Sequence, residues 1–218
     1  AQLDRVAEIA HRHGALLVVD STFTPPVMFR PLEHGADLVV HSATKYMAGH
    51  GDTLAGVVLG REETRPVVQY LMKTLGPNLG PFEAYLTMRG VKTLPLRFER
   101  QCRNAREVAE SLNGAPGDGP FGAMVAVELE GGRERALAFM NALELAVPAT
   151  SLGDVHTLAL YPPMSSHRDL APKHRQRLGI GDGLVRLSIG IEAVEDILAD
   201  LRQALETSAL TAAKPVLD

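Results

Sequence analysis

Apolar runs of strand length alternate with helical patterns up to residue 93 of the chain. Two of the runs, residues 15–19 and 38–41, are continuous and rich in β-branched side chains, a pattern typical of strands covered on both faces in a parallel sheet. Asp4 is placed to cap the first helix and Gly14 to end it. The pattern predicts strands at residues 15–19, 38–41 and 55–59 and helices at residues 4–13, 62–75 and 82–93.

A long helical pattern then divides the chain. Apolar side chains recur at helical spacing through residues 94–112, which predicts a helix that joins two domains. The sequence GAPGDGP, residues 114–120, ends this helix. Beyond it, the pattern predicts strands at residues 123–129 and 184–189 and helices at residues 133–143 and 194–205. This alternation indicates a second, smaller α/β layer.

The composition indicates a globular protein with a sizeable core, since 45% of the 218 residues are hydrophobic. The formal net charge of -4, with acids and bases interspersed, gives no indication of a nucleic acid or an anionic membrane as partner. No run reaches the roughly 20 apolar residues of a membrane span, and the first residues lack the apolar core of a signal peptide. The sequence therefore predicts a cytoplasmic location.

Cysteine and histidine form no recognisable metal motif. Cys102, the single cysteine, lies in a polar helical pattern and is expected to have an ordinary role on the helix surface. His34, His41 and His50 share no face with a further ligand, so polar or packing roles are expected and no metal is predicted. The segment GHGDTLAG lacks the Gly-Lys-Ser/Thr ending of a nucleotide-binding P-loop.

Polar side chains follow the first two strands at the points where they end. Asp20 follows residues 15–19, and Ser42, Thr44 and Lys45 follow residues 38–41. The carboxyl ends of strands in open α/β sheets are where ligands bind. Pyridoxal phosphate needs an imine-forming lysine, an acid for its ring nitrogen and donors for its phosphate, and these four residues offer all three. A helix-capping aspartate and a surface lysine beside capping hydroxyls remain the alternative.

The segment VVDSTFTPPVMFRPLEHGADLVVHSATKYMAGHGD resembles the signature of the pyridoxal-phosphate enzymes of cysteine and methionine metabolism. Four further blocks follow in the order of that family: GPFEA at residues 80–84, RGVKTL at 89–94, SLGD at 151–154 and GLVRLSIGIE at 183–192. The resemblance implies the α/β fold of fold-type I, aspartate-aminotransferase-like transferases that depend on pyridoxal phosphate. Residues 1–95 then correspond to the carboxyl-terminal part of the large domain, and residues 96–218 to the smaller domain, which begins with the connecting helix.

The same resemblance implies roles for the polar residues after the first two strands. Lys45 would hold the cofactor through its aldehyde carbon and then move protons between substrate carbons. Asp20 would pair with the pyridine nitrogen, and Ser42 and Thr44 would contact the phosphate.

In the second half of the chain, the resemblance implies a substrate site. Arg186 would bind the substrate α-carboxylate in a two-bond fork, with Ser151 beside it. An exposed strand arginine and a loop serine are the alternatives.

The chain also departs from the family pattern. Ser21 stands where the family commonly has asparagine, so any contact of that asparagine to the cofactor must be weaker or replaced. Thr150 stands where members that act on cystathionine often carry glutamate, which disfavours cystathionine as substrate. The family's amino-terminal half, with its phosphate turn and ring-stacking tyrosine, has no counterpart before Ala1, and the family is longer around residues 114–120. A fragment or a chain with missing pieces is expected, because a sheet without its first strands exposes an apolar edge.

These implications predict elimination or replacement at the γ or β carbon of sulfur-containing or O-acylated amino acids, with pyridoxal phosphate as cofactor. A carbon-sulfur lyase resembling methionine gamma-lyase or cystathionine gamma-lyase is favoured, and O-acylhomoserine sulfhydrylase or cystathionine gamma-synthase chemistry is the alternative. The expected partners are a small amino-acid substrate and further copies of the chain, as a dimer or tetramer. A different class stays open: an inactive fragment that serves as a binding or assembly module.

Overall fold

The computed structural model of the chain describes residues 2–113 and 121–212, so the predicted break at residues 114–120 lies outside the described residues. The chain forms two compact units. The first ends at Leu96 and the second begins at Arg97, so the boundary falls within the first turn of helix α4 (Leu94–Asn113). Each unit has its own sheet and is described by itself.

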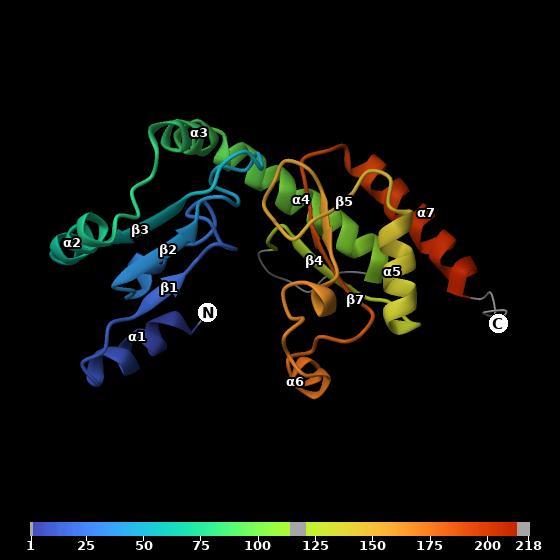
Figure 1. Ribbon diagram of the computed structural model, residues 1–218, viewed down its shortest axis with the longest axis horizontal. Helices are drawn as coiled ribbons and strands as arrows, with labels where there is room; N and C mark the ends of the chain where they lie inside the picture. Colours follow the sequence, from blue (N-terminus) through green and yellow to red (C-terminus); the bar gives the residue numbers. More distant parts are fainter. Residues whose placement is uncertain (1, 114–120, 213–218) are drawn as a thin grey trace. The chain divides into compact units, whose positions relative to one another are not determined.

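The sheet of the first unit has three strands in the order β1-β2-β3. β1 (Val18–Asp20) runs parallel to β2 (Leu38–Ser42), and β3 (Gly56–Gly60) runs antiparallel to β2 on its other side (Figure 1). Asp20 is in register with Val40. The carboxyl ends of β1 and β2 therefore meet at one edge of the sheet, as the sequence predicts.

The predicted strand coverage on both faces is wrong for β1. Leu16 and Val18 are 65% and 53% exposed, and regular pairing begins only at Val18. Val18 is exposed whereas Val19, whose side chain lies on the opposite face, is partly buried, so the described residues leave one face of β1 uncovered.

Three helices of the first unit lie close to their predicted positions: α1 (Leu3–Arg12), α2 (Arg65–Leu75), which the 3-10 turn η2 (Glu62–Thr64) precedes, and α3 (Pro81–Val91). The 3-10 turn η1 (Pro31–His34) was not predicted. The predicted cap at Asp4 is wrong, because α1 begins at Leu3 and places Asp4 in its first turn. There, Asp4 Oδ1 lies 3.0 Å from Nδ1 of His34. Gly14 has the left-handed φ of 68° expected after a helix end.

The second unit has a four-stranded sheet in the order β4-β7-β6-β5. β4 (Met124–Glu128), β7 (Leu184–Ser188) and α5 (Gly132–Ala142) lie close to their predicted positions. α7 (Val194–Ala212) begins at the predicted residue but extends beyond the predicted end at residue 205. The short elements β5 (Val147–Pro148), β6 (Leu158–Leu160), η3 (Pro162–Met164) and α6 (Pro172–Arg177) were not predicted. Runs of two to six residues carry too little periodicity to be recognised.

Helices α4, α5 and α7 cover one face of this sheet and bury the core of the second unit (Figure 1). Val185 and Leu187 of β7 are fully buried in this core. Since side chains alternate along a strand, Arg186 and Ser188 belong to the opposite face. Cys102 on α4 is half-buried, and burial raises the pKa of its thiol to about 11, which keeps the thiol neutral at physiological pH. Within the described ranges, no helix is long and apolar enough to cross a membrane.

Candidate functional site

The predicted lysine lies in a tight turn that directly follows β2. The main-chain N–H of Lys45 donates to the Ser42 carbonyl at 3.1 Å, and the Gly49 N–H donates to the Lys45 carbonyl at 2.8 Å. Ser42 is the last residue of β2 and lies at the same edge as Asp20, the last residue of β1. The structure thus brings Asp20, Ser42 and Lys45 to one edge of the sheet of the first unit.

Thr22 connects the ends of these two strands. Its hydroxyl donates to Oδ1 of Asp20 at 2.6 Å, and its main-chain N–H donates to the same oxygen at 3.0 Å. The Thr22 hydroxyl also accepts the Ser42 N–H at 2.8 Å. Sequence reasoning missed Thr22, although an aspartate that accepts the main-chain N–H two residues further on is a recognised turn pattern.

The charge of Asp20 follows from these contacts. The Thr22 side chain first and its main-chain N–H second hold the pKa of Asp20 below its usual value, because both bonds favour the carboxylate. His41 of β2 is buried, and burial lowers its pKa although the charge of Asp20 opposes this shift. At neutral pH, β1 therefore ends in an anionic Asp20, and the neighbouring strand β2 carries a neutral His41.

Thr44 fastens the lysine turn to the start of β3. Its hydroxyl accepts the main-chain N–H of Ala55 at 3.0 Å, and its own N–H donates to the Ala55 carbonyl at 3.2 Å. Ala55 directly precedes β3. All four residues predicted to bind the cofactor thus belong to one connected structure in the first unit.

Helix α3 packs closely against the turn that carries Lys45. A Cβ atom added to Gly90 would lie far inside contact distance of the Ala48 carbonyl oxygen, so only glycine lets α3 approach this closely. Ala43, Tyr46 and Ala48 in the turn are buried. The RGVKTL block recognised in the sequence therefore supports the segment that carries Lys45.

The two predicted substrate residues come together in the second unit. Nη2 of Arg186 donates to the main-chain carbonyl of Ser151 at 3.1 Å. The Ser188 hydroxyl, two residues further along β7, accepts the Gly153 N–H at 2.8 Å. Ser151 therefore contacts Arg186 through its main chain, which sequence reasoning did not anticipate.

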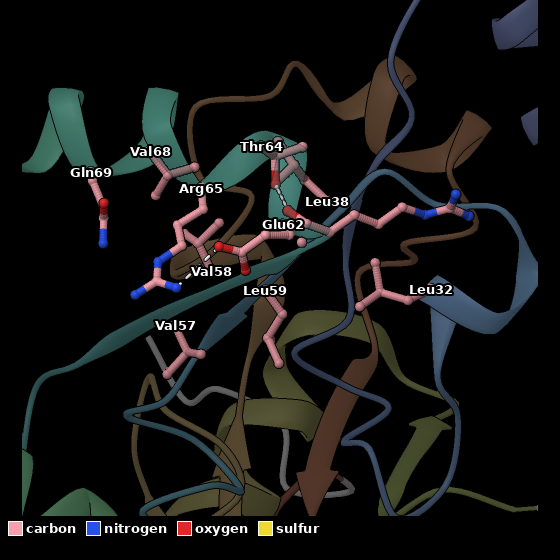
Figure 2. Close-up of a pocket in the computed structure, with 12 residues that line it drawn as sticks. Leu32, Leu38, Val57, Val58, Leu59, Glu62, Thr64, Arg65, Val68 and Gln69 are labelled. Atoms are coloured by element: carbon pink, nitrogen blue, oxygen red, sulfur yellow. Dashed lines mark hydrogen bonds and ion pairs between the residues drawn. The ribbon is translucent and has the colours of Figure 1, made fainter.

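A separate open groove of about 420 Å³ lies between β3, η2 and α2 (Figure 2). Apolar side chains of Val57, Leu59 and Val68 line it. Glu62 and Arg65 form an ion pair of 3.1 Å beside them. None of the six predicted site residues lines this groove, so the chemistry proposed below does not use it.

Comparison with known proteins gives a match along most of the chain. A family model described as "Cys/Met metabolism PLP-dependent enzyme" matches residues 1–117 and 118–206. An L-methionine gamma-lyase of Pseudomonas putida is 46% identical over 96% of this chain and 58% of its own length. An O-succinylhomoserine sulfhydrylase of Pseudomonas aeruginosa is 39% identical over 92% of this chain and 55% of its own.

Solved structures agree with this match. The cystathionine gamma synthase of Xanthomonas oryzae pv. oryzae, in complex with aminoacrylate and cysteine, has a TM-score of 0.91 and 39% identity. That match covers 97% of this chain and 60% of the synthase. The predicted fold class is confirmed, with an incomplete large domain. The chain spans less than two thirds of the length of these relatives.

Proposed function

Since the chain belongs to the family of Cys/Met metabolism PLP-dependent enzymes, we propose that it carries the lysine and the ring-nitrogen acid of a carbon-sulfur lyase. The substrate class is small sulfur-containing amino acids, and the reaction is elimination at the γ carbon. The similarity to methionine gamma-lyases supports this choice. One observation carries the proposal. The Thr22 hydroxyl donates to the anionic carboxylate of Asp20 and accepts the main-chain N–H of Ser42, at the end of the strand that leads to Lys45.

The residues of this edge fit pyridoxal phosphate. A carboxylate that two hydrogen bonds keep anionic suits a protonated pyridine nitrogen. Lys45 is placed three residues beyond the end of β2, where its amine would hold the aldehyde carbon. The hydroxyls of Ser42 and Thr44 would serve the phosphate. When bound, the cofactor supplies an electron sink for the charge that forms at the substrate α-carbon.

The side chains of the chain itself would then perform three tasks. The Lys45 amine would act as general base and acid. It takes the proton from the α-carbon and, after giving that proton up, takes one from the β-carbon. The electrons of the broken Cβ–H bond then form the Cβ–Cγ double bond as the Cγ–S bond breaks, and the sulfur leaves as a thiol after taking up a proton. Asp20 keeps the ring nitrogen protonated. Arg186 binds the substrate carboxylate in a two-bond fork, which its planar guanidinium does better than a lysine. Ser151 contributes its carbonyl to the placement of that guanidinium.

The visible absorption of the purified protein with added pyridoxal phosphate tests cofactor binding. We expect a new absorption band when the cofactor binds, and we expect Lys45→Ala to remove it. Lys73 is an exposed lysine of α2, and Lys73→Ala should leave the band in place. A band that survives Lys45→Ala equally well would refute the assignment of Lys45. A protein that forms no band would show that this chain does not hold the cofactor.

Replacement chemistry is the second candidate. The similarity to an O-succinylhomoserine sulfhydrylase supports it, and Thr150 disfavours cystathionine as the substrate of either reaction. An assay with methionine, cystathionine and O-succinylhomoserine, each with and without sulfide, separates the two. Ammonia, a 2-oxo acid and a thiol from methionine support the lyase, whereas sulfide-dependent product from O-succinylhomoserine supports the sulfhydrylase.

We further propose that the chain forms a homo-oligomer, a dimer or tetramer. Phe82, Tyr85 and Met88 recur every three residues along α3 and are 67%, 60% and 66% exposed. A contiguous apolar face of this kind is typical of a protein interface. Light scattering should give a mass of two or four chains, and Phe82→Ser with Tyr85→Ser should lower it. A monomeric mass for the unsubstituted protein would contradict the proposal.

A further inference from the structure

The face of β7 that points away from the helical core carries two polar side chains. Val185 and Leu187 lie in the core, so Arg186 and Ser188 share the other face. In register beside them on β6 are Leu160, opposite Arg186, and Leu158, opposite Ser188. Ser188 is 1% exposed, so its hydroxyl is a buried polar group that needs a partner.

The segment of residues 151–153 supplies partners to both side chains. The Ser151 carbonyl accepts from Nη2 of Arg186 at 3.1 Å, and the Gly153 N–H donates to the Ser188 hydroxyl at 2.8 Å. The two contacts are two residues apart on the segment and two residues apart on β7. Gly153 has a left-handed φ of 78°, which favours glycine at this position.

The segment is also held beyond Gly153. Nε2 of Gln101 donates to the Asp154 carbonyl at 2.7 Å. Further on, the carboxylate of Glu192 accepts both the N–H and the hydroxyl of Thr157, and the Thr157 hydroxyl accepts the Gly190 N–H at 3.0 Å. The side of the segment after Gly153 is therefore fixed by α4 and by residues after β7, while Ser188 fixes the side next to Arg186.

We propose that Ser188 is a positioning residue for Arg186. Its hydroxyl holds residues 151–153 against β7, so that the Ser151 carbonyl sets the plane in which the Arg186 guanidinium meets a carboxylate. The inference rests on the proposed function in one respect, namely that Arg186 binds the substrate. Two-bond recognition depends on this plane, so a guanidinium that turns freely binds a carboxylate less well.

The experiment compares Ser188→Ala with two matched variants. Ser188→Thr keeps a hydroxyl at the same position on a strand, where a β-branched side chain is accommodated. Ser208→Ala removes another buried hydroxyl, one that donates to Leu205 within α7, away from residues 151–153. Amide exchange of Gly153 and 15N relaxation of the Arg186 Nε–H are measured by NMR on the folded chain without substrate.

We expect Ser188→Ala to speed Gly153 exchange by about 10- to 100-fold, the effect of losing one buried hydrogen bond. It should also increase the motion of the Arg186 side chain. Ser188→Thr and Ser208→Ala should leave the exchange rate of the Gly153 amide and the motion of the Arg186 side chain close to those of the unsubstituted protein. Unchanged Gly153 exchange in Ser188→Ala would overturn the inference, and so would faster exchange with an unchanged Arg186 signal.

Steady-state kinetics connects this result to function. In the protein loaded with pyridoxal phosphate, Ser188→Ala should raise KM for the amino acid about tenfold with a smaller change in kcat. An unchanged KM despite a mobile Arg186 would overturn the positioning role. Failure of the proposed function looks different: the unsubstituted protein would turn over no substrate, while the two NMR measurements would still report on Ser188.

Discussion

Thr22 donates both its hydroxyl and its main-chain N–H to the same oxygen of Asp20, at 2.6 and 3.0 Å. The same hydroxyl accepts the N–H of Ser42 on the neighbouring strand. One threonine therefore fixes the orientation of the carboxylate and joins the two strand ends. In the proposed function, this joint sets the position of the acid relative to the segment that carries Lys45.

Removal of the Thr22 hydroxyl should raise the pKa of Asp20 toward its ordinary value. The Thr22 side chain is the largest cause of the lowered pKa, so Thr22→Val should raise it more than Thr22→Ser, which keeps the donor. A 13C NMR titration of the Asp20 carboxyl in the protein without cofactor measures the effect. Equal pKa values in the two variants would contradict the role given to the hydroxyl.

The pH dependence of stability should contain a contribution from His41. Its pKa in the folded protein is lowered chiefly by burial, so the unfolded chain binds a proton more readily. The contribution of His41 to the free energy of unfolding is therefore fully present above about pH 6.5. It is lost as the pH falls toward the lower pKa of His41 in the folded protein. The charge of Asp20 opposes this loss in part.

Urea unfolding at pH 7.5, 6.5 and 5.5 measures this contribution. His41→Gln, which cannot titrate, should show a smaller loss of stability between pH 7.5 and 5.5 than the unsubstituted protein. Parallel losses in the two proteins would assign the pH dependence to other groups.

Gly90→Ala should destabilise the first unit although it improves helix propensity. Alanine in a helix interior gains about 1 kcal/mol over glycine. Here the added Cβ would collide with the main chain of Ala48, and overpacking of this kind costs about 1–3 kcal/mol. Because the obstructing atoms are backbone, the loss should outweigh the gain.

Gly56→Ala provides the matched control for Gly90→Ala. Gly56 lies in the same unit, and a Cβ there meets no atom within 4 Å. Urea midpoints should fall for Gly90→Ala and stay within about 0.5 kcal/mol for Gly56→Ala. Equal stability of the two variants would show that α3 can move away from the lysine turn at no cost.

Asp200 should be a major stabilising carboxylate of the second unit. It is buried and accepts the main-chain N–H groups of Glu144, Leu145 and Ala146 at 2.8 to 3.0 Å. Burial alone would raise its pKa, but these bonds and one from Gln203 outweigh burial and lower it. The stabilisation is present above the ordinary value of 3.8 and is lost as the pH falls through the lower folded-state pKa.

Asp200→Asn tests this role. The amide offers one acceptor oxygen instead of two, so one or more buried N–H groups lose their partner, at a cost of about 1–3 kcal/mol. Asp169→Asn, with a side chain that is 93% exposed, should change stability by less than about 0.5 kcal/mol. Equal unfolding free energies for Asp200→Asn and the unsubstituted protein at pH 7 would contradict the prediction.

The sequence by itself determined the elements that local patterns encode. Continuous β-branched runs identified β1 and β2, and the helical stripe identified α4, because apolar runs and helical periodicity are properties of neighbouring residues. The order of strand, Asp20, strand and Lys45 was sufficient to predict that these residues meet at one edge. The separated motif blocks identified the family.

Tertiary structure decided the contacts that hold these residues in place. Thr22 and Ser42 are 20 residues apart, Gly153 and Ser188 are 35 apart, and Asp200 binds main-chain groups 54 to 56 residues away. The exposure of Val18 on one face of β1 was likewise visible only in the tertiary structure. Hydrogen-bond partners at such separations depend on strand register and loop path, which no local periodicity encodes.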